Sequence, residues 1–175
     1  MEDVLYSKIK VLNETIWENR ADKKRIEQWL NNFKDEKEKL HALFLLSKFV
    51  YFGSVQMRYL LKSIYRDLFK YRIVKEIREE NKHITDFNFI SEKFEERLSK
   101  TRFLGVGNPS ESGVHLLYFF RQENRLAKSQ FIDSHEIFDR SDPSNVKLLD
   151  PSIREYVFID DFCGSGSQAT AYSQH

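Results

Sequence analysis

The sequence predicts an α+β protein, with a helical N-terminal domain over residues 1–100 and an incomplete parallel-sheet α/β domain over residues 101–175. Three observations lead to this fold class. Apolar residues recur at helical spacing as far as about Lys100. Short apolar runs separated by turn residues replace that pattern from Thr101 onward. Finally, an uninterrupted apolar run precedes two aspartates, which is typical of a strand buried on both faces of a parallel sheet.

The first hundred residues predict a series of amphipathic helices separated by capping residues. Asp22 and Ser54 are suitable N-caps, and Asp86 or Ser91 is suitable for the last helix. The second helix would direct a stripe of apolar side chains inward, namely Ile26, Trp29, Leu30 and Phe33. The expected helices cover approximately residues 4–16, 22–33, 34–50, 55–77 and 86–98.

The composition restricts the class of partner and the compartment. There are 28 Lys and Arg residues against 27 Asp and Glu, and the two signs alternate along the helices. No global field therefore attracts nucleic acid or membrane, and we expect no direct binding to either. One cysteine excludes an internal disulfide framework, and neither a signal peptide nor a membrane-spanning run is found. These features predict a cytoplasmic protein.

Two histidines and a basic cluster of the helical region are candidate functional residues. Neither His41 nor His83 has neighbours at metal-ligand spacing, so both are interpreted as structural and no metal site is predicted. The cluster Lys23–Arg25 would suit a recognition module, including one for nucleic acid. Because acids balance these charges, a solvated helical bundle is the preferred interpretation.

The strongest functional pattern lies near the end of the chain. The apolar run Tyr156–Ile159 is followed by Asp160 and Asp161, and then by the small-residue turn Gly164–Gln168. Acids at the carboxyl end of a parallel strand stand where ligands bind in α/β sheets. Such a turn can direct successive N–H groups at a phosphate, with a helix start at about Ala169 adding its dipole. The alternative is a buried strand whose Asp-rich turn only caps a helix.

A second strand-loop-helix pattern occurs upstream. Arg102–Gly107 predicts a short strand, and residues 114–120 predict a buried helix that is apolar nearly all round. The loop between them suits an anion, because its backbone amides precede a helix. Its candidate contact residues are Gly107, Asn108, Ser110, Ser112 and Gly113.

The interval between these two patterns gives weaker signals. Residues 129–138 predict a second strand, and the polar residues 139–145 predict a loop. His135 and Glu136 could perform acid–base chemistry, or could simply lie at the surface end of a strand. The remaining candidates for phosphate contacts are Lys147, Arg121 and Arg125, although an exposed helix face suits both arginines better.

The segment from Tyr156 to Gln168 resembles the ribose-phosphate signature of type I phosphoribosyltransferases. The resemblance implies that Asp160 and Asp161 hold the ribose hydroxyls of phosphoribosyl pyrophosphate. It also implies that the 5-phosphate is bound by Gly164, Ser165, Gly166, Ser167 and Gln168, the last of which stands where the family usually has Thr. The loop 107–113 would hold the pyrophosphate, and the loop 139–145 would close over the substrate.

Together with the leader Ile26–Phe33 and the loop 107–113, this segment resembles the PRTase-CE proteins, which are predicted effectors of bacterial conflict systems, some of them associated with retrons. The resemblance implies a Rossmann-like fold and binding of phosphoribosyl pyrophosphate or a nucleotide, together with Mg²⁺ held by the diphosphate. It further implies a role in anti-phage defence and a protein partner encoded in the same defence operon.

The predicted sheet is short of strands after the phosphate turn. A complete sheet of this type needs further strands, which leaves three interpretations: a fragment, a truncated copy, or a sheet completed by a partner. We favour the first two, and so expect the chain to be inactive alone, with no catalytic residue assigned. The alternative function is a non-catalytic helical interaction or regulatory module with a nucleotide-sensing loop.

Overall fold

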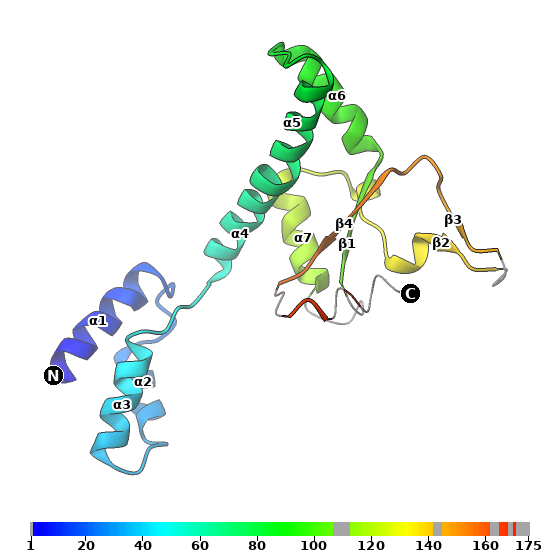
Figure 1. Cartoon of the computed structure of the whole chain (residues 1–175). Coiled ribbons are helices and arrows are strands. Elements are labelled where there is room, and N and C mark those ends of the chain that lie inside the picture. The colour runs from blue at the N-terminus through cyan, green and yellow to red at the C-terminus, as the bar shows by residue number, and fades with distance from the viewer. Residues whose placement is uncertain (1, 107–112, 142–144, 162–164, 168–169, 171–175) are drawn as a thin grey trace. The chain divides into compact units, whose positions relative to one another are not determined.

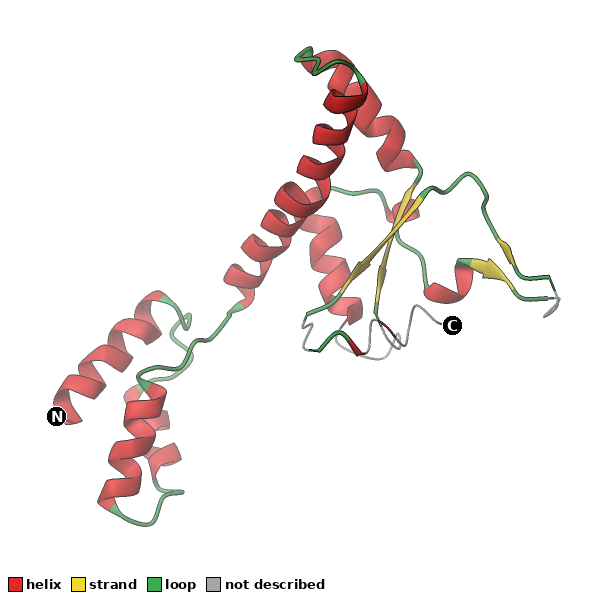
Figure 2. Cartoon of the chain, viewed as in Figure 1, coloured by secondary structure: helices red, strands yellow, loops and turns green. Residues whose placement is uncertain are grey.

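The computed structural model divides into two compact units, Met1–Tyr59 and Leu60–His175, which are considered separately (Figures 1 and 2). The structure describes residues 2–106, 113–141, 145–161, 165–167 and 170. Contacts divide the chain at a different place from the change in sequence pattern near Lys100. The domain boundary inferred from that pattern therefore stays a prediction.

The first unit is helical and has one apolar core. Its core residues come from successive helices and the loops between them, and are Ile9, Trp17, Ile26, Leu30, Ala42 and Leu43. The helices are α1 (Glu2–Thr15), α2 (Lys23–Leu30), α3 (Glu36–Leu46) and the beginning of α4 (Ser54–Ser63). The amphipathic pattern of the sequence therefore predicted these helices, with ends that differ by a few residues.

Side-chain caps define where several helices begin. The Asp22 carboxylate accepts the N–H of Arg25 at 2.8 Å, as predicted, and Asp86 accepts that of Phe89 at 2.9 Å. The cap predicted for Ser54 is wrong, because the N–H of Val55 is accepted instead by a carboxylate oxygen of Glu18, at 3.1 Å. A side chain 37 residues away in sequence thus satisfies this helix start.

The second unit contains the rest of the long helical stretch predicted over residues 55–77. This stretch comprises α4, the π-helical segment η1 (Ile64–Lys70) and α5 (Tyr71–Glu80), which follow one another directly. After a turn, α6 (Phe87–Ser99) leads into the sheet. The π-helical segment was not predicted, because a change from i−4 to i−5 hydrogen bonding leaves the apolar spacing nearly unaltered.

The sheet of the second unit is formed by strands distant in sequence. Strand β1 (Thr101–Gly105) pairs in parallel with β4 (Glu155–Ile159), and the two lie side by side in Figure 1. The connection between them contains α7 (Gly113–Asn124), which packs against both strands. It also contains two 3₁₀ turns and a small antiparallel pair, namely η2 (Lys128–Gln130), η3 (Ser134–Glu136), β2 (Phe138–Asp139) and β3 (Lys147–Leu148).

Phe103 is the centre of the core that supports this sheet. Its side chain is fully buried, and its ring centroid lies 5.1 Å from that of Phe69, 5.4 Å from that of Phe120 and 5.5 Å from that of Phe131. These rings come from η1, from α7 and from the segment after η2. One β1 side chain therefore holds three elements against the sheet.

Two predictions for this region are wrong. Residues 129–138 do not form a second strand: Phe131 makes only an isolated bridge with Phe103, and two 3₁₀ turns occupy half of the interval. Local side-chain bonds favour these turns, since Gln130 accepts the N–H of Ala127 and Glu136 accepts that of Asp133. Helix α7 is not buried all round, because Leu116 and Phe120 are buried whereas Tyr118 is 48% exposed.

The architecture confirms part of the predicted fold class. The described residues combine helices with a two-stranded parallel sheet, as an α+β assignment requires. The larger Rossmann-like sheet stays a prediction. No helix in the described ranges is long and apolar enough to cross a membrane.

We predict that Phe103→Ala lowers the free energy of unfolding of the second unit by about 3–5 kcal/mol, since it leaves a cavity among three rings. Urea denaturation followed by far-ultraviolet circular dichroism measures this change. Phe87→Ala is the matched control, because Phe87 is 80% exposed and its loss should alter stability by less than about 0.5 kcal/mol. Equal effects of the two substitutions would contradict the assignment of Phe103 as the core centre.

A pH-dependent stability is expected from Tyr65. Burial, with a smaller contribution from Glu95, raises the pKa of its phenol from the ordinary 10.0 to about 12. The folded state then binds more protons than the unfolded state between these values, so stability is intact below pH 10 and falls as the pH rises towards 12. The midpoint temperature of thermal unfolding across this range should depend less steeply on pH in Tyr65→Phe than in the wild type. Tyr71→Phe, which alters a 66% exposed ring, should keep the original slope.

Candidate functional site

The parallel register brings the carboxyl ends of β1 and β4 to one edge of the sheet. Gly105 stands beside Ile159, and the N–H of Val106 donates to the carbonyl oxygen of Ile159 at 3.4 Å. The chain therefore leaves both strands at adjacent points. The loop that follows β1 and the acids that follow β4 start from the same edge, where α/β proteins bind ligands.

The two aspartates occupy the end of β4. Ile159 is the last residue of that strand and therefore not part of a helix. Its side chain is buried, with 5% exposed. Asp160 is half-buried and Asp161 is exposed. One carboxylate oxygen of Asp160 accepts the N–H of Asp161 at 2.9 Å, which restrains the side chain and leaves its other oxygen for a ligand.

A tight turn and a helical start follow the acids. Gly166 has a φ of +78°, a left-handed conformation that glycine adopts without strain. The hydroxyl oxygens of Ser165 and Ser167 lie 2.6 Å apart, and the N–H of Thr170 donates to the carbonyl of Gly166 at 2.9 Å. Helical backbone begins at Ser167, slightly earlier than predicted. Gly164 and Gln168 lie outside the described residues.

The predicted pyrophosphate loop is only partly covered by the structure. Gly113 is the first residue of α7, so the expected order of strand, loop and helix is present. The other candidates lie outside the described residues, namely Gly107, Asn108, Ser110 and Ser112. Their role, like that of the turn residues, stays a prediction.

A groove of about 450 Å³ lies along β4 and includes Asp160. The helical side of the groove consists of Ile64, Leu68, Phe69, Arg72 and Phe120. Arg72 forms ion pairs with Glu76 and with Glu155 of β4. Sequence analysis missed Arg72 and Glu155, because 83 positions separate them and no local pattern links the two.

The weaker candidate residues from the sequence do not lie among the residues that line the groove along β4. Lys147 and Arg125 are exposed, and Arg121 lies with its guanidinium carbon 6.0 Å from the ring centroid of Tyr118. His135 and Glu136 are exposed in η3, where Asp133 lies close enough to share a metal ion with them. Exposed groups of this kind are common without a metal, and Glu136 already accepts the N–H of Asp133 at 2.8 Å.

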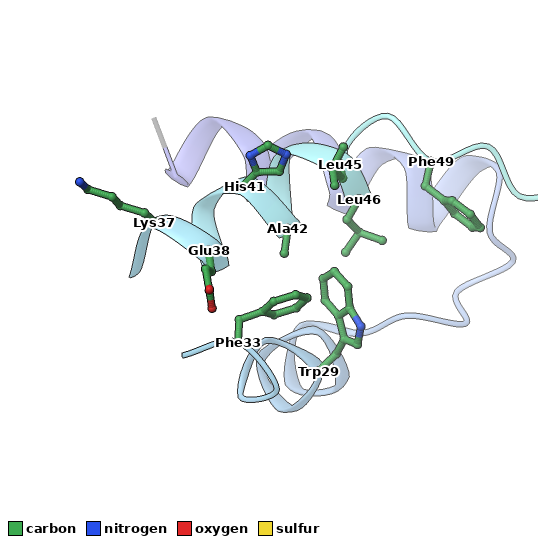
Figure 3. A pocket seen from close by; sticks show the side chains of 9 residues that line it. All are labelled: Trp29, Phe33, Lys37, Glu38, His41, Ala42, Leu45, Leu46 and Phe49. Carbon is green, nitrogen blue, oxygen red and sulfur yellow. The ribbon is translucent and has the colours of Figure 1, made fainter. Parts of the chain in front are cut away.

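The first unit contains a second, apolar concavity of about 840 Å³ (Figure 3). Trp29 and Phe33 face Ala42 and Leu46 across it, and the rings of Trp29 and Phe33 meet edge to face, 5.1 Å apart. Trp29 is 39% exposed, so the predicted inward stripe is correct for Ile26 and Leu30, whereas Trp29 forms a groove wall. The full lining is Trp29, Phe33, Lys37, Glu38, His41, Ala42, Leu45, Leu46 and Phe49.

Comparison with known proteins gives one finding. The model of the family PRTase-CE matches residues 26–175, a range that includes both concavities and the strand-end acids. No curated protein and no solved structure matches the chain.

We predict that Gly166→Ala destabilises the turn locally by about 1–2 kcal/mol, because a Cβ disfavours the left-handed backbone. Amide hydrogen exchange of Thr170, whose N–H bonds to Gly166, should then accelerate roughly tenfold. The matched control is Gly105→Ala, where an added Cβ would meet its nearest neighbour at an ordinary 3.5 Å. Unchanged exchange in Gly166→Ala would contradict the assigned turn geometry.

Proposed function

The chain belongs to the PRTase-CE family, and we propose that this phosphoribosyltransferase-like protein binds phosphoribosyl pyrophosphate or a nucleotide at the carboxyl edge of β1 and β4. The observation that carries the proposal is the register in which Gly105 stands beside Ile159. In that register, the two aspartates after β4 and the loop after β1 begin at neighbouring positions of the sheet edge. A ligand with a ribose between two phosphate groups needs such an arrangement of acceptors and amide donors.

Each part of the site has a distinct role in this proposal. Asp160 and Asp161 accept hydrogen bonds from the two ribose hydroxyls, which suits carboxylates because they are acceptors only. The turn at Ser165–Ser167 supplies hydroxyl and N–H donors for the 5-phosphate, near a helix start that favours negative charge. The family resemblance implies that the loop preceding Gly113 holds the pyrophosphate.

The donors at the strand end suit Mg²⁺ bound together with the ligand. Mg²⁺ favours one or two carboxylates combined with phosphate oxygens, and Asp160 and Asp161 offer the carboxylates. When bound, the metal would neutralise charge on the diphosphate. Asp160, restrained through the N–H of Asp161, would orient the ribose so that its anomeric carbon faces an acceptor.

Transfer of the bound sugar to an acceptor would be a further step beyond binding. In a transfer, an acceptor atom would bond to the anomeric carbon and the pyrophosphate would leave with the electron pair of the broken bond. No described residue at this edge is assigned as the base that activates an acceptor, so a catalytic residue is not proposed.

A second candidate function is a non-catalytic interaction module with a nucleotide-sensing loop. The apolar concavity at Trp29 and Phe33 favours it, because an exposed aromatic groove is typical of a surface that binds a partner. For either function, the family resemblance supports a role in anti-phage defence, with a partner from the same operon and a cytoplasmic location.

We predict that Asp160→Asn with Asp161→Asn weakens binding of phosphoribosyl pyrophosphate plus Mg²⁺ at least about 100-fold. The reason is that two hydrogen bonds to charged acceptors, each contributing roughly 1.5–3 kcal/mol, lose their charge assistance. Isothermal titration calorimetry on the folded chain measures the affinity.

The control is Asp139→Asn with Asp150→Asn, which removes the same charge from exposed positions of the same unit. Equal affinity of the wild type and the Asp160 and Asp161 variant would refute the ribose site, as would a wild type that gives no binding heat. Pyrophosphate release in the presence of candidate acceptors then separates transfer from sensing. Release supports an enzyme, and binding without release supports the second candidate.

A further inference from the structure

The apolar groove of the first unit lies between α2 and α3 (Figure 3). The rings of Trp29 and Phe33 form one wall, and the aliphatic side chains of Ala42, Leu45 and Leu46 form the other. Trp29 and Leu45 are exposed, Leu45 by 57%. Contiguous apolar surface of this kind marks a binding site more often than isolated exposed residues do. The groove therefore suits apolar side chains of a partner.

Basic groups accompany the groove along α3. Lys37 and His41 belong to its lining and are four residues apart, so they lie on one face of the helix. Lys48 follows His41 by seven residues, just beyond the helix end, and its ammonium lies 5.7 Å from the ring centroid of Phe44. Neither lysine makes an ion pair with another described residue. The groove thus has a basic border along α3.

The acids near this border are engaged in local contacts. Glu38 is the one acid among the lining residues, and one of its carboxylate oxygens accepts the N–H of Lys34 at 2.8 Å. Glu36 pairs with Lys39 at 2.7 Å, and Asp35 caps the start of α3. The lysines of the border are therefore available to carboxylates of a partner.

The shape of the groove favours a helix over a nucleic acid strand. Helix α3 from Lys37 to Leu46 is about 13–14 Å long, and three apolar side chains at i, i+4 and i+7 of a second helix span about 10–11 Å. Single-stranded nucleic acids need aromatic faces on which bases stack. Here the rings of Trp29 and Phe33 meet edge to face, and the opposite wall is aliphatic.

We propose that this groove binds an acidic amphipathic helix of a partner protein. The apolar side chains of that helix enter between α2 and α3, and its carboxylates pair with Lys37, His41 and Lys48. Because like charges that face each other across an interface are unfavourable, the same border disfavours basic helices. The proposal names the partner for the second candidate function and rests on it, but it does not involve the strand-end site.

Three peptides of one design test the proposal on the whole chain. Each is a fluorescein-labelled, hydrocarbon-stapled helix of about 15 residues, with leucine at i, i+4 and i+7. The positions that flank the leucines are all Glu, all Gln or all Lys. Fluorescence anisotropy should show that the Glu peptide binds at least several-fold more tightly than the Gln peptide, and that the Lys peptide binds most weakly. Added salt should reduce these differences.

A substitution in the groove locates the bound peptide. Leu45→Glu should weaken binding of the Glu peptide at least tenfold, because it places a charge where an apolar side chain is to be buried. Val11→Glu is the matched control, since Val11 is 58% exposed and lies on α1, outside the groove lining. Circular dichroism confirms that both variants are folded. Equal affinities of the two variants would place the peptide elsewhere and overturn the proposal.

Charge reversal tests the basic border. Lys37→Glu with Lys48→Glu should reverse the order of affinity, so that the Lys peptide binds more tightly than the Glu peptide. Lys10→Glu with Lys24→Glu changes the net charge equally at exposed positions outside the groove lining, and should keep the original order.

The remaining outcomes separate this proposal from the functions proposed above. Equal affinity for the three peptides, or strongest binding of the Lys peptide, would overturn the acidic partner and leave the groove as an interaction surface. No binding of any peptide would overturn the second candidate function as well. Displacement of the Glu peptide by oligouridylate or oleate, at lower concentration than by unlabelled Glu peptide, would assign the groove to nucleic acid or lipid instead. The calorimetric test of Asp160 and Asp161 uses other variants, so either result can fail alone.

Discussion

The parallel pairing of β1 with β4 is the constraint on which the second unit depends. Five residues of each strand pair in register, although the two strands are separated by some fifty positions of chain. This pairing requires a crossover connection, and α7 within that connection covers the sheet. Phe103 then joins η1, α7 and the segment after η2 beneath the strands. Because η1, α7, the segment after η2 and strand β1 all contact the ring of Phe103, the packing of this core fixes the position of the sheet. Asp160 follows β4 directly, so its position depends on the same packing.

Strand β4 belongs both to the candidate site and to the groove beside it. Strand β4 carries the acids at its carboxyl end and forms one wall of the groove along its length. Arg72 and Glu155 fix the other end of the groove through an ion pair between α5 and β4.

Sequence patterns predicted the structure best where local interactions decide it. They were least informative where they are outweighed by competing or distant side chains. The helices of residues 2–99 follow from apolar spacing and from caps such as Asp22 and Asp86. The strand before Asp160 follows from its unbroken apolar run. The patterns failed where side chains compete with regular structure: Gln130 and Glu136 hold 3₁₀ turns in a segment whose apolar content favours a strand. The cap of α4 was missed because Glu18 is remote in sequence.

By itself, the sequence determined the helical order, the two short strands and the residue types available at the candidate site, because propensity, capping and apolar spacing act over a few residues. Only the tertiary structure decided that the ends of β1 and β4 are neighbours, that Arg72 reaches Glu155, and that Trp29 forms a groove wall rather than core. These features depend on contacts between segments distant in sequence. Their energy comes from burial and hydrogen bonding that no local pattern contains.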